Sequence, residues 1–446
     1  MKTIITNSII ITMNSDMEVF PDGYVKIEGT KILETGPSCD LKETTEELRA
    51  AGWQIKDGKR GILMPGMVNT HCHLGMIPFR GLGDDCKDRL RVFLLPMEQK
   101  AMSRRMAALS SHYAICELLL SGVTSVMDMY YFEAAVAQVM DQTGIRGIAG
   151  QTLMDEGGCD ASDADQSLSM AKELIETYRM HPRISGCAAP HATNTCSPQI
   201  LKKAWELDTA NQVPFTLHAA EMDYEMTWLA QTRGCTPVGY LDQLGVLSDQ
   251  TAAAHCIHLT DRDIEILRQR GSGVCHCIGS NAKAAKGVAP VLKLLKEGVS
   301  VGLGTDGPAS GNTLDLFTQM RLCAGFQKND SHDRSAMPAK DIVSMATRQG
   351  ARVLGLEEKT GSIEPGKEAD LVLVETDSPN MFPVYDPYSA LVYSANASNV
   401  RDVYVAGTCL VQDKKLVYED FESIRRELSD CMGRSAFGEM QELHRL

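Results

Sequence analysis

Apolar runs of strand length alternate with amphipathic stretches of helix length through the middle of the chain. The amphipathic stretches, such as QILKKAWELDTANQ (199–212) and TDRDIEILRQR (260–270), have apolar residues at i, i+3, i+4 and i+7, which is the spacing of one helix face. The apolar runs are nearly continuous, as in strands that are buried on both faces. There are eight of these runs: GILMPGMVNTHCH (61–73), GVTSVMDM (122–129), IRGIAGQTLM (145–154), RISGCAAPH (183–191), VPFTLHAAE (213–221), TAAAHCIHL (251–259), GSGVCHCIG (271–279) and VSVGLGTDG (299–307). The pattern predicts an α/β protein with a (β/α)₈ TIM barrel rather than an open doubly wound sheet.

The two ends of the chain have a different pattern from the middle. Short runs such as SIIITM (8–13) and GYVKIEG (23–29) are separated by turn signals, and ADLVLVE (369–375) and VRDVYVAGTCLVQDKKLV (400–417) repeat this style near the other end. Together they predict one small β-sandwich domain built from both termini. The expected divisions are 1–60 for the first part of the sandwich, 61–364 for the barrel, 365–420 for the second part of the sandwich and 421–446 for a C-terminal helical tail.

Composition narrows the classes of partner. The 446-residue chain has a formal net charge of −14 and no cluster of Lys and Arg, which argues against a nucleic-acid partner. No apolar run approaches the roughly 20 residues of a spanning helix, and polar residues interrupt the N-terminal MKTIITNSIIITMNSD where a signal peptide would be apolar. Fourteen cysteines without framework spacing predict reduced thiols and a cytoplasmic location. We therefore expect a small-molecule substrate, with no nucleic-acid or membrane partner.

Polar residues suited to metal binding lie near the ends of most of the predicted barrel strands. Barrel enzymes place their catalytic groups at the C-terminal ends of the strands, so we expect these side chains to meet. In the first strand, His71 and His73 point to one side while Cys72 points to the other. A single histidine is more often a core or surface residue than a ligand, but six such strand ends are difficult to explain in that way. The residues are His71, His73, His191, His218 with Glu221, His255, His276 and Asp306.

These strand ends could supply the ligands of a catalytic metal ion. Imidazole nitrogen and carboxylate oxygen suit Zn²⁺ or Fe²⁺, and a catalytic cation needs one open position for water. Such a cation lowers the pKa of its water toward about 7. The residues alone leave His255 open as a further ligand. A set that leaves one position free consists of His71, His73, His218 and Asp306.

Glu221 follows His218 by three residues, at the start of a loop. A carboxylate at that point could carry protons between water and substrate. No lysine ends the fourth predicted strand, where a carboxylated lysine bridges two metals in related binuclear enzymes. We therefore expect one divalent metal ion, Zn²⁺, with Fe²⁺ as the alternative.

Five segments of the chain resemble the amidohydrolase superfamily, and the similarity covers nearly the whole length. Within it they resemble the branch of 5'-methylthioadenosine/S-adenosylhomocysteine deaminases and s-triazine hydrolases. The HxH pair, the strand-five His with a Glu three residues later, the HC of strand six and the GTDG of strand eight occur in a specific order. The segments are PGMVNTHCHLGMIPFRG, TLHAAE, AAHCIHL, APVLKLLKEGVSVGLGTDGPAS and GSIEPGKEADLVLVE.

The resemblance implies a mononuclear Zn²⁺ or Fe²⁺ deaminase. Its implied metal ligands are His71, His73, His218 and Asp306. Glu221 would protonate a ring nitrogen, while His255 and Asp306 would orient the attacking hydroxide and Asp306 would pass its proton to the departing amine. The resemblance therefore makes His255 a catalytic partner rather than a ligand. It also implies a homo-oligomer, a dimer or a tetramer.

Four residues are candidates for substrate binding. Glu98 in LLPMEQK matches the Glu that binds ribose hydroxyls in the deaminase branch, and His191 in APHATN matches a histidine that touches the base. Arg89 in CKDRLRVF stands where that branch normally has Trp, and Gln151 in GIAGQTL stands where it has an arginine. Exchange of an indole for a guanidinium would favour a more polar or anionic ligand.

The expected function is hydrolytic deamination of an amino-substituted heteroaromatic ring. The expected substrate is an adenosine-type compound such as 5'-methylthioadenosine or S-adenosylhomocysteine, which would release ammonia. The alternative is a chlorohydrolase or another hydrolase of s-triazine, pterin, guanine or cytosine-like rings. Glu221 favours deamination, because a basic leaving amine needs a proton and chloride does not. A non-catalytic scaffold would have lost metal ligands, and none is missing here.

Overall fold

Eight parallel strands, in two sheets of four, form the centre of the molecule. The structure, a computed structural model, describes residues 2–437. The sheet orders are β6-β7-β8-β9 and β10-β11-β12-β13. The strands are β6 (Met67–Cys72), β7 (Val123–Tyr130), β8 (Arg146–Leu153), β9 (Ile184–Pro190), β10 (Phe215–Ala219), β11 (Thr251–His255), β12 (Gly273–His276) and β13 (Val301–Leu303). Each of the eight apolar runs supplies one strand of the barrel, which confirms the predicted α/β class and its alternation.

Main-chain hydrogen bonds at the C-terminal ends of the outer strands close the two sheets into a barrel. The N–H of His218 donates to the carbonyl of His191 at 3.1 Å where β10 lies beside β9. The N–H of Asp306 donates to the carbonyl of His71 at 3.0 Å where β13 lies beside β6. Four residues predicted for the functional site therefore also join the two halves of the barrel.

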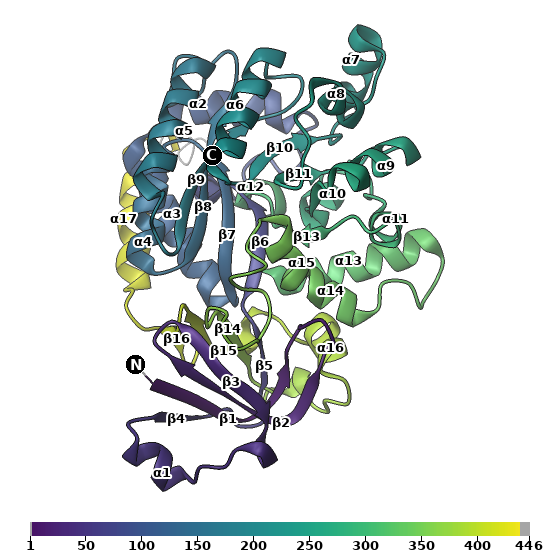
Figure 1. Ribbon diagram of the computed structural model, residues 1–446. Coiled ribbons are helices and arrows are strands. Elements are labelled where there is room, and N and C mark those ends of the chain that lie inside the picture. The colour runs from purple at the N-terminus through teal and green to yellow at the C-terminus, as the bar shows by residue number, and fades with distance from the viewer. Residues whose placement is uncertain (1, 438–446) are drawn as a thin grey trace.

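Helices cover the outside of these strands (Figure 1). One example shows how the sequence sets their ends: Thr260 and Asp263 form a capping box at the start of α9, and Gly271 ends that helix with a φ of 73°. The last helix, α17, packs against α3, and residues 438–446 of the predicted helical tail lie outside the described residues. The helices are α1 (Thr45–Ala50), α2 (Leu95–Ala101), α3 (Arg104–Leu120), α4 (Glu133–Thr143), α5 (Ala164–Tyr178), α6 (Pro198–Asn211), α7 (Asp223–Arg233), α8 (Pro237–Leu244), α9 (Asp261–Arg270), α10 (Ile278–Lys283), α11 (Val291–Lys296), α12 (Pro308–Gly311), α13 (Leu316–Ser331), α14 (Ala339–Ala346), α15 (Arg348–Val353), α16 (Pro387–Ser389) and α17 (Phe421–Gly433).

Strands from both ends of the chain form a third sheet, of nine strands, below the barrel (Figure 1). Its order is β17-β16-β15-β14-β5-β1-β2-β3, and β4 also pairs with β1. The central strand β5 pairs with β1 from the N-terminal part and with β14 from the C-terminal part. The strands are β1 (Lys2–Ile11), β2 (Val19–Glu28), β3 (Lys31–Pro37), β4 (Gln54–Asp57), β5 (Ile62–Pro65), β14 (Leu371–Val374), β15 (Val400–Val405), β16 (Thr408–Gln412) and β17 (Lys415–Leu416).

The first apolar run contributes to both sheets. We expected 61–73 to open the barrel, but Ile62–Pro65 pair with strands of the terminal sheet and only Met67–Cys72 pair within the barrel. The chain passes from one sheet to the other at Gly66, where a Cβ would lie 2.0 Å from Thr124 Oγ1. A residue with no side chain is required there, because the two segments approach closely.

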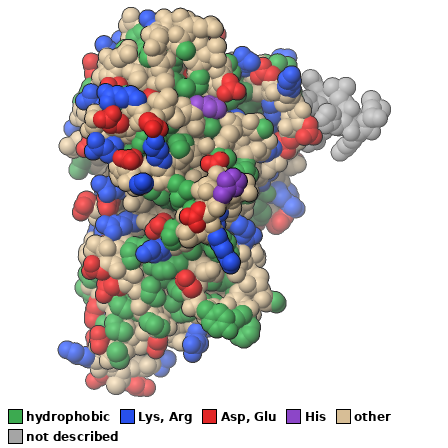
Figure 2. Space-filling model, turned by 90° about the vertical axis from the view of Figure 1, so that its right-hand side faces the viewer, with side chains coloured by type: hydrophobic (Ala, Val, Ile, Leu, Met, Phe, Trp, Pro, Cys, Tyr) green, Lys and Arg blue, Asp and Glu red, His purple; other side chains and the backbone are tan. Residues whose placement is uncertain are grey.

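Three observations bear on the expected surroundings of the protein. All fourteen cysteines are free thiols. Within residues 2–437, no helix has both the length and the apolar character needed to cross a bilayer. On the face seen in Figure 2, described acidic and basic side chains are interspersed, so this face has no continuous basic surface of the kind that binds a phosphate backbone.

Candidate metal centre and active site

A cavity of about 440 Å³ opens at the C-terminal ends of the barrel strands. The segment 84–90 and the turn after α10 contribute to its walls. Of the four candidates for substrate binding, Arg89, Glu98 and His191 line this cavity, but Gln151 does not. The other predicted residues on its walls are His73, His218, Glu221, His255 and Asp306. The strand ends thus meet at one place, as barrel topology predicts.

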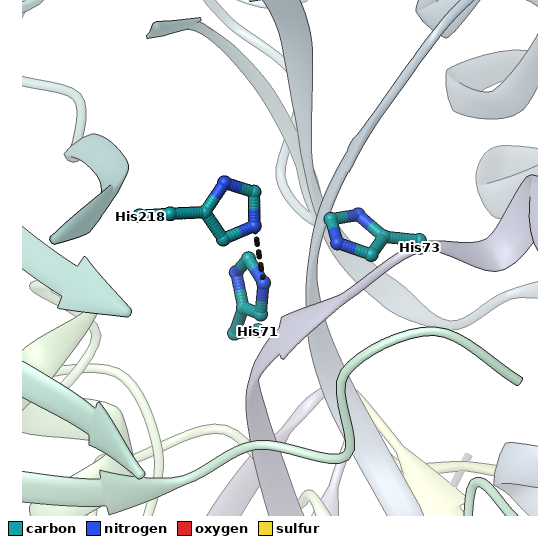
Figure 3. A group of neighbouring side chains, drawn as sticks. All are labelled: His71, His73 and His218. Carbon is teal, nitrogen blue, oxygen red and sulfur yellow. Dashed lines mark hydrogen bonds between the residues drawn. The ribbon is translucent and has the colours of Figure 1, made fainter. Parts of the chain in front are cut away.

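Three histidines at the base of the cavity lie close enough to hold one metal ion. His71 belongs to β6, His73 follows directly after it, and His218 belongs to β10. One ring nitrogen from each lies within 4.8 Å of the other two, and the Nε2 atoms of His71 and His218 are 3.2 Å apart. Figure 3 shows the three rings converging, with both rings of the HxH pair directed to the same side. All three side chains are buried.

Hydrogen bonds determine which ring nitrogens are free to bind a cation. A carbonyl oxygen only accepts, so His73 Nδ1 donates to Met129 at 2.5 Å and His218 Nδ1 donates to His191 at 2.7 Å. Burial holds the pKa of His218 well below its usual range, so this ring is neutral and its Nε2 carries the lone pair, the arrangement found in metal-binding histidines. His73 Nε2 lies 3.3 Å from Asp306 Oδ1, so a proton or a cation lies between those two atoms. The lone pair of His218 lies close to His71 Nε2, so the two rings repel unless a proton or a cation lies between them. The donor set therefore fits a bound metal ion.

Asp306 places a carboxylate beside this cluster. Its Oδ1 is 3.3 Å from His73 Nε2, and its Oδ2 is 3.9 Å from His255 Nε2. Burial alone would raise the pKa of Asp306, but its hydrogen bond to His73 and the charges of His73 and His255 hold that pKa well below its usual range. The φ of 58° is unusual for a residue with a side chain, and the N–H of Gly307 donates to Oδ1 at 2.6 Å. The carboxylate is thus ionised and held in place.

His255 is oriented by a partner on the next helix but one. Its Nδ1 donates to Oδ1 of Asn281, on α10, at 2.9 Å. Its Nε2 is therefore directed to two carboxylates, Asp306 at 3.9 Å and Glu221 at 3.6 Å. His255 lies outside the group of three histidines whose ring nitrogens converge. This position suits a group that acts on a water molecule or substrate beside the metal. Sequence analysis missed Asn281.

Glu221 forms an ion pair with a lysine that sequence analysis also missed. The ammonium of Lys286 donates to Glu221 Oε1 at 2.5 Å, and the two side chains are 16% and 15% exposed. Burial would raise the pKa of Glu221, but the charges of His255 and Lys286 outweigh it and keep the pKa well below its usual range. Lys286 is not at a strand end. Its only signal in the sequence was a lysine among small residues in GSNAKAAKG (279–287).

Two predicted substrate residues present polar atoms to the cavity. Glu98, on α2, is buried and accepts a hydrogen bond from Tyr130 Oη at 2.5 Å. Burial raises the pKa of Glu98 to about 7, although the Tyr130 hydrogen bond lowers it. His191 Nδ1 lies 3.0 Å from Thr195 Oγ1, and burial lowers the pKa of His191 to about 4. His191 is therefore neutral near pH 7.

The other two predicted substrate residues bind the protein itself. The guanidinium of Arg89 donates to three main-chain carbonyls, at 2.6, 2.7 and 3.2 Å, and so connects the cavity wall to Ala309. The amide of Gln151 donates to Asp160 at 3.0 Å, outside the cavity. The charge that we expected to favour an anionic ligand is thus directed at carbonyl oxygens. Whether the Arg89 guanidinium binds a ligand or the protein depends on where the side chain points, and residue spacing in the sequence does not predict that direction.

This chain belongs to the amidohydrolase family, because its residues 62–410 match the family described as "Amidohydrolase family". The chain is 38% identical to a 5-methylthioadenosine/S-adenosylhomocysteine deaminase of Thermodesulfovibrio yellowstonii over 417 residues, 93% of this chain and 94% of that protein. It is 37% identical to a 5'-deoxyadenosine deaminase of Methanothermobacter thermautotrophicus over 413 residues, 92% and 94% of the two chains. The structure of an adenosine deaminase from Xanthomonas campestris with bound zinc is similar with a TM-score of 0.92 at 30% identity, over 97% of this chain and 98% of that one. The predicted family is confirmed.

Proposed function

We propose that this chain is a metal-dependent hydrolase that removes the amino group of a heteroaromatic ring as ammonia. The proposed substrate is an adenosine-type compound such as 5'-methylthioadenosine or S-adenosylhomocysteine. One observation carries this proposal: three converging histidines lie beside Asp306, Glu221 and His255 at the base of a cavity. The three relatives named above, which are deaminases of adenosine compounds, support this choice of ring.

The proposed cofactor is one divalent metal ion, Zn²⁺, with Fe²⁺ as the alternative. Its proposed ligands are His71, His73, His218 and Asp306. When bound, such a cation supplies a Lewis acid that makes water nucleophilic near neutral pH. The single three-histidine cluster among the described residues supports one ion, and the zinc in the Xanthomonas campestris structure supports its identity.

Glu221, His255 and Asp306 are proposed to move the protons. Glu221 accepts a proton from water and donates it to the ring nitrogen beside the reacting carbon, which makes that carbon more electrophilic. His255 and Asp306 orient the water, whose oxygen adds to the carbon that carries the amino group. Asp306 then passes the remaining proton to the amine. The C–N bond breaks, ammonia leaves, and the ring keeps a carbonyl oxygen.

Glu98 and His191 are the proposed contacts to the substrate. Glu98 would accept hydrogen bonds from ribose hydroxyls, and His191 would contact the base. Apolar side chains such as Met76 and Leu94 line the same cavity and would face the thioether group at the 5' position of either compound. For Arg89 we propose that it shapes the wall of the cavity rather than binds a charged group. Gln151 would support this wall indirectly through Asp160.

Glu98 should make substrate affinity depend on pH. Its pKa of about 7 means that the carboxylate is ionised above pH 7 and protonated below it. Hydrogen bonds to a charged group contribute about 1.5–3 kcal/mol, so KM should follow the ionised fraction of Glu98 and rise by about 10-fold as the pH falls from about 8 to about 6. Glu98→Gln should have a high KM that no longer changes with pH. Steady-state kinetics from about pH 6 to about pH 8 measure this. A substrate without ribose hydroxyls is the control, and the same pH dependence for it would contradict the assigned contact.

Further proposals concern the whole chain. We propose that the terminal sheet folds as a sandwich, because Ile5 and Val25 share one apolar cluster with Leu371 and Tyr404. Its domain would comprise 1–65 and 365–420, because Ile62–Pro65 pair with strands from both of these parts, beside a barrel domain from Met67 to residue 364 and a helical tail from 421. A homo-oligomer, a cytoplasmic location and the lack of nucleic-acid and membrane partners stay predictions from the family and the composition.

Ammonia release across a panel of amino-heterocycles tests the proposed function. The panel contains adenosine derivatives, guanine, cytosine, pterins and aminotriazines, with chlorinated triazines and cyclic amides beside them. We expect the highest kcat/KM for adenosine-type compounds, with equimolar ammonia and carbonyl product. Release of chloride or ring opening by the metal-loaded protein, without ammonia from any amino-heterocycle, would identify a different reaction.

A further inference from the structure

The turn after α10 directs a lysine into the base of the cavity. The main chain is left-handed at Ala285, with a φ of 52°, and reaches a φ of 119° at Gly287, which glycine accepts without strain. The N–H of Lys286 donates to the carbonyl of Asn281 at 3.0 Å and fixes the turn. Lys286 lies between these two positions, and its side chain lines the cavity with 16% of its surface exposed.

A second lysine in the same segment takes a different course. Lys283 contacts Asp84 at 2.7 Å and Asn312 at 2.5 Å, on segments that form the wall of the cavity. Lys286 instead has Glu221 as its hydrogen-bond partner, and within residues 2–437 its ammonium makes no other hydrogen bond. The two ammonium groups therefore serve different parts of the cavity, and only one contacts the proposed proton carrier.

Packing does not explain a lysine at this position. Removal of an ammonium and a carboxylate from water costs several kcal/mol for each ion, and apolar side chains of similar size are often as stable or more stable in such places. The partner of Lys286 is also the residue that transfers the proton in the proposed reaction. We propose that Lys286 is a positioning residue that holds the carboxylate of Glu221 in the orientation needed for proton transfer, an inference that rests on the proposed function.

The contacts of Glu221 show how this positioning works. Lys286 binds Oε1, which is also the oxygen 3.6 Å from His255 Nε2. The main chain is held separately, because the N–H of Glu221 donates to Glu225 Oε2 at 3.1 Å. Oε2 of Glu221 makes no hydrogen bond to any described residue, so it is the oxygen that can accept the proton from water and donate it to the ring nitrogen. Lys286 keeps its own protons throughout.

Kinetics of lysine variants test this role. Lys286→Met should lower kcat by about 10- to 100-fold with little change in KM, because misplacement of a reacting group slows the chemical step. Lys286→Arg should retain most of the activity. Metal content and thermal unfolding should match the wild type, and Lys286→Gln replaces the Met variant if the latter unfolds early. Lys293→Met, on α11 with an exposed ion pair to Asp261, is the control. A wild-type kcat in Lys286→Met would overturn the proposal.

A double-mutant cycle with Glu221→Gln separates positioning from a general structural effect. If Lys286 acts through Glu221, Lys286→Met should lower kcat by no more than about twofold when Glu221→Gln is already present. An equal loss in both backgrounds would show that Lys286 acts elsewhere. The assay of the wild-type protein distinguishes failure of the proposed function from failure of the role proposed for Lys286. Absence of ammonia from every amino-heterocycle overturns the proposed function and this inference with it, whereas an active wild type with an equally active Lys286→Met overturns the inference alone.

Discussion

Glu221→Gln should lower kcat for ammonia release by about 10²- to 10⁴-fold, the range for loss of a general acid–base group. Gln has the same shape and keeps an oxygen that Lys286 can contact, but an amide does not take up the proton that the ring nitrogen needs. The residue lies outside the three-histidine cluster, so metal content should stay at the wild-type level. Ammonia assays and metal analysis on the same preparation measure both quantities.

The matched control for this variant is Glu206→Gln. Glu206 is exposed on α6 and does not line the cavity, so the same chemical change there should leave kcat unaltered. A near-normal rate in Glu221→Gln would remove Glu221 from the proton path. Loss of metal together with activity would instead make it a ligand or a support of one.

His71→Ala should remove both metal and activity. The His71 side chain is completely buried, and its Nε2 faces His218 Nε2 at 3.2 Å. Loss of a group that only supports a ligand already costs about 10- to 100-fold in metal affinity, so loss of a proposed ligand should cost more. Metal titration gives the affinity, and ammonia release by the metal-saturated variant gives the residual rate. Thermal unfolding shows whether the barrel survives.

His258→Ala is the control for loss of an imidazole. His258 is partly exposed and pairs with the exposed Asp223 at 3.4 Å, so its removal should leave metal affinity and kcat unchanged. Wild-type metal affinity in His71→Ala would show that the cation, if one binds, lies elsewhere. Full activity in a metal-free variant would contradict the proposed chemistry.

The barrel and the chemical residues of the site could be predicted because their signals are local. Strand and helix periods repeat along the chain, and the barrel rule places the ends of all strands together, so His71, His218 and Asp306 could be grouped from their positions alone. Chemistry alone did not decide the role of His255. Its ring is oriented by Asn281, a contact between elements that no spacing rule describes.

Other features depend on contacts between segments that are far apart in the sequence, and local sequence patterns do not predict such contacts. The sequence pattern predicted residues 62–65 as part of a barrel strand, but they pair with β1 and β14 and so belong to the terminal sheet. Arg89 was predicted to contact the substrate, but its guanidinium donates hydrogen bonds to main-chain carbonyl groups of the cavity wall. No sequence motif marks Lys286, because its proposed role depends on Glu221, whose carboxylate lies 2.5 Å from the ammonium only in the folded chain.

The proposal of a metal-dependent deaminase is tested most directly by measuring how ammonia release depends on bound metal. The purified chain is stripped with a chelator, reloaded with measured amounts of Zn²⁺, and assayed with 5'-methylthioadenosine at each step. We predict no ammonia from the metal-free protein, a rate that rises in proportion to bound Zn²⁺ until a single ion per chain, and ammonia equimolar with the carbonyl product. Undiminished ammonia release by the stripped protein, or no release at any metal content while the protein stays folded, would contradict a metal-dependent deaminase.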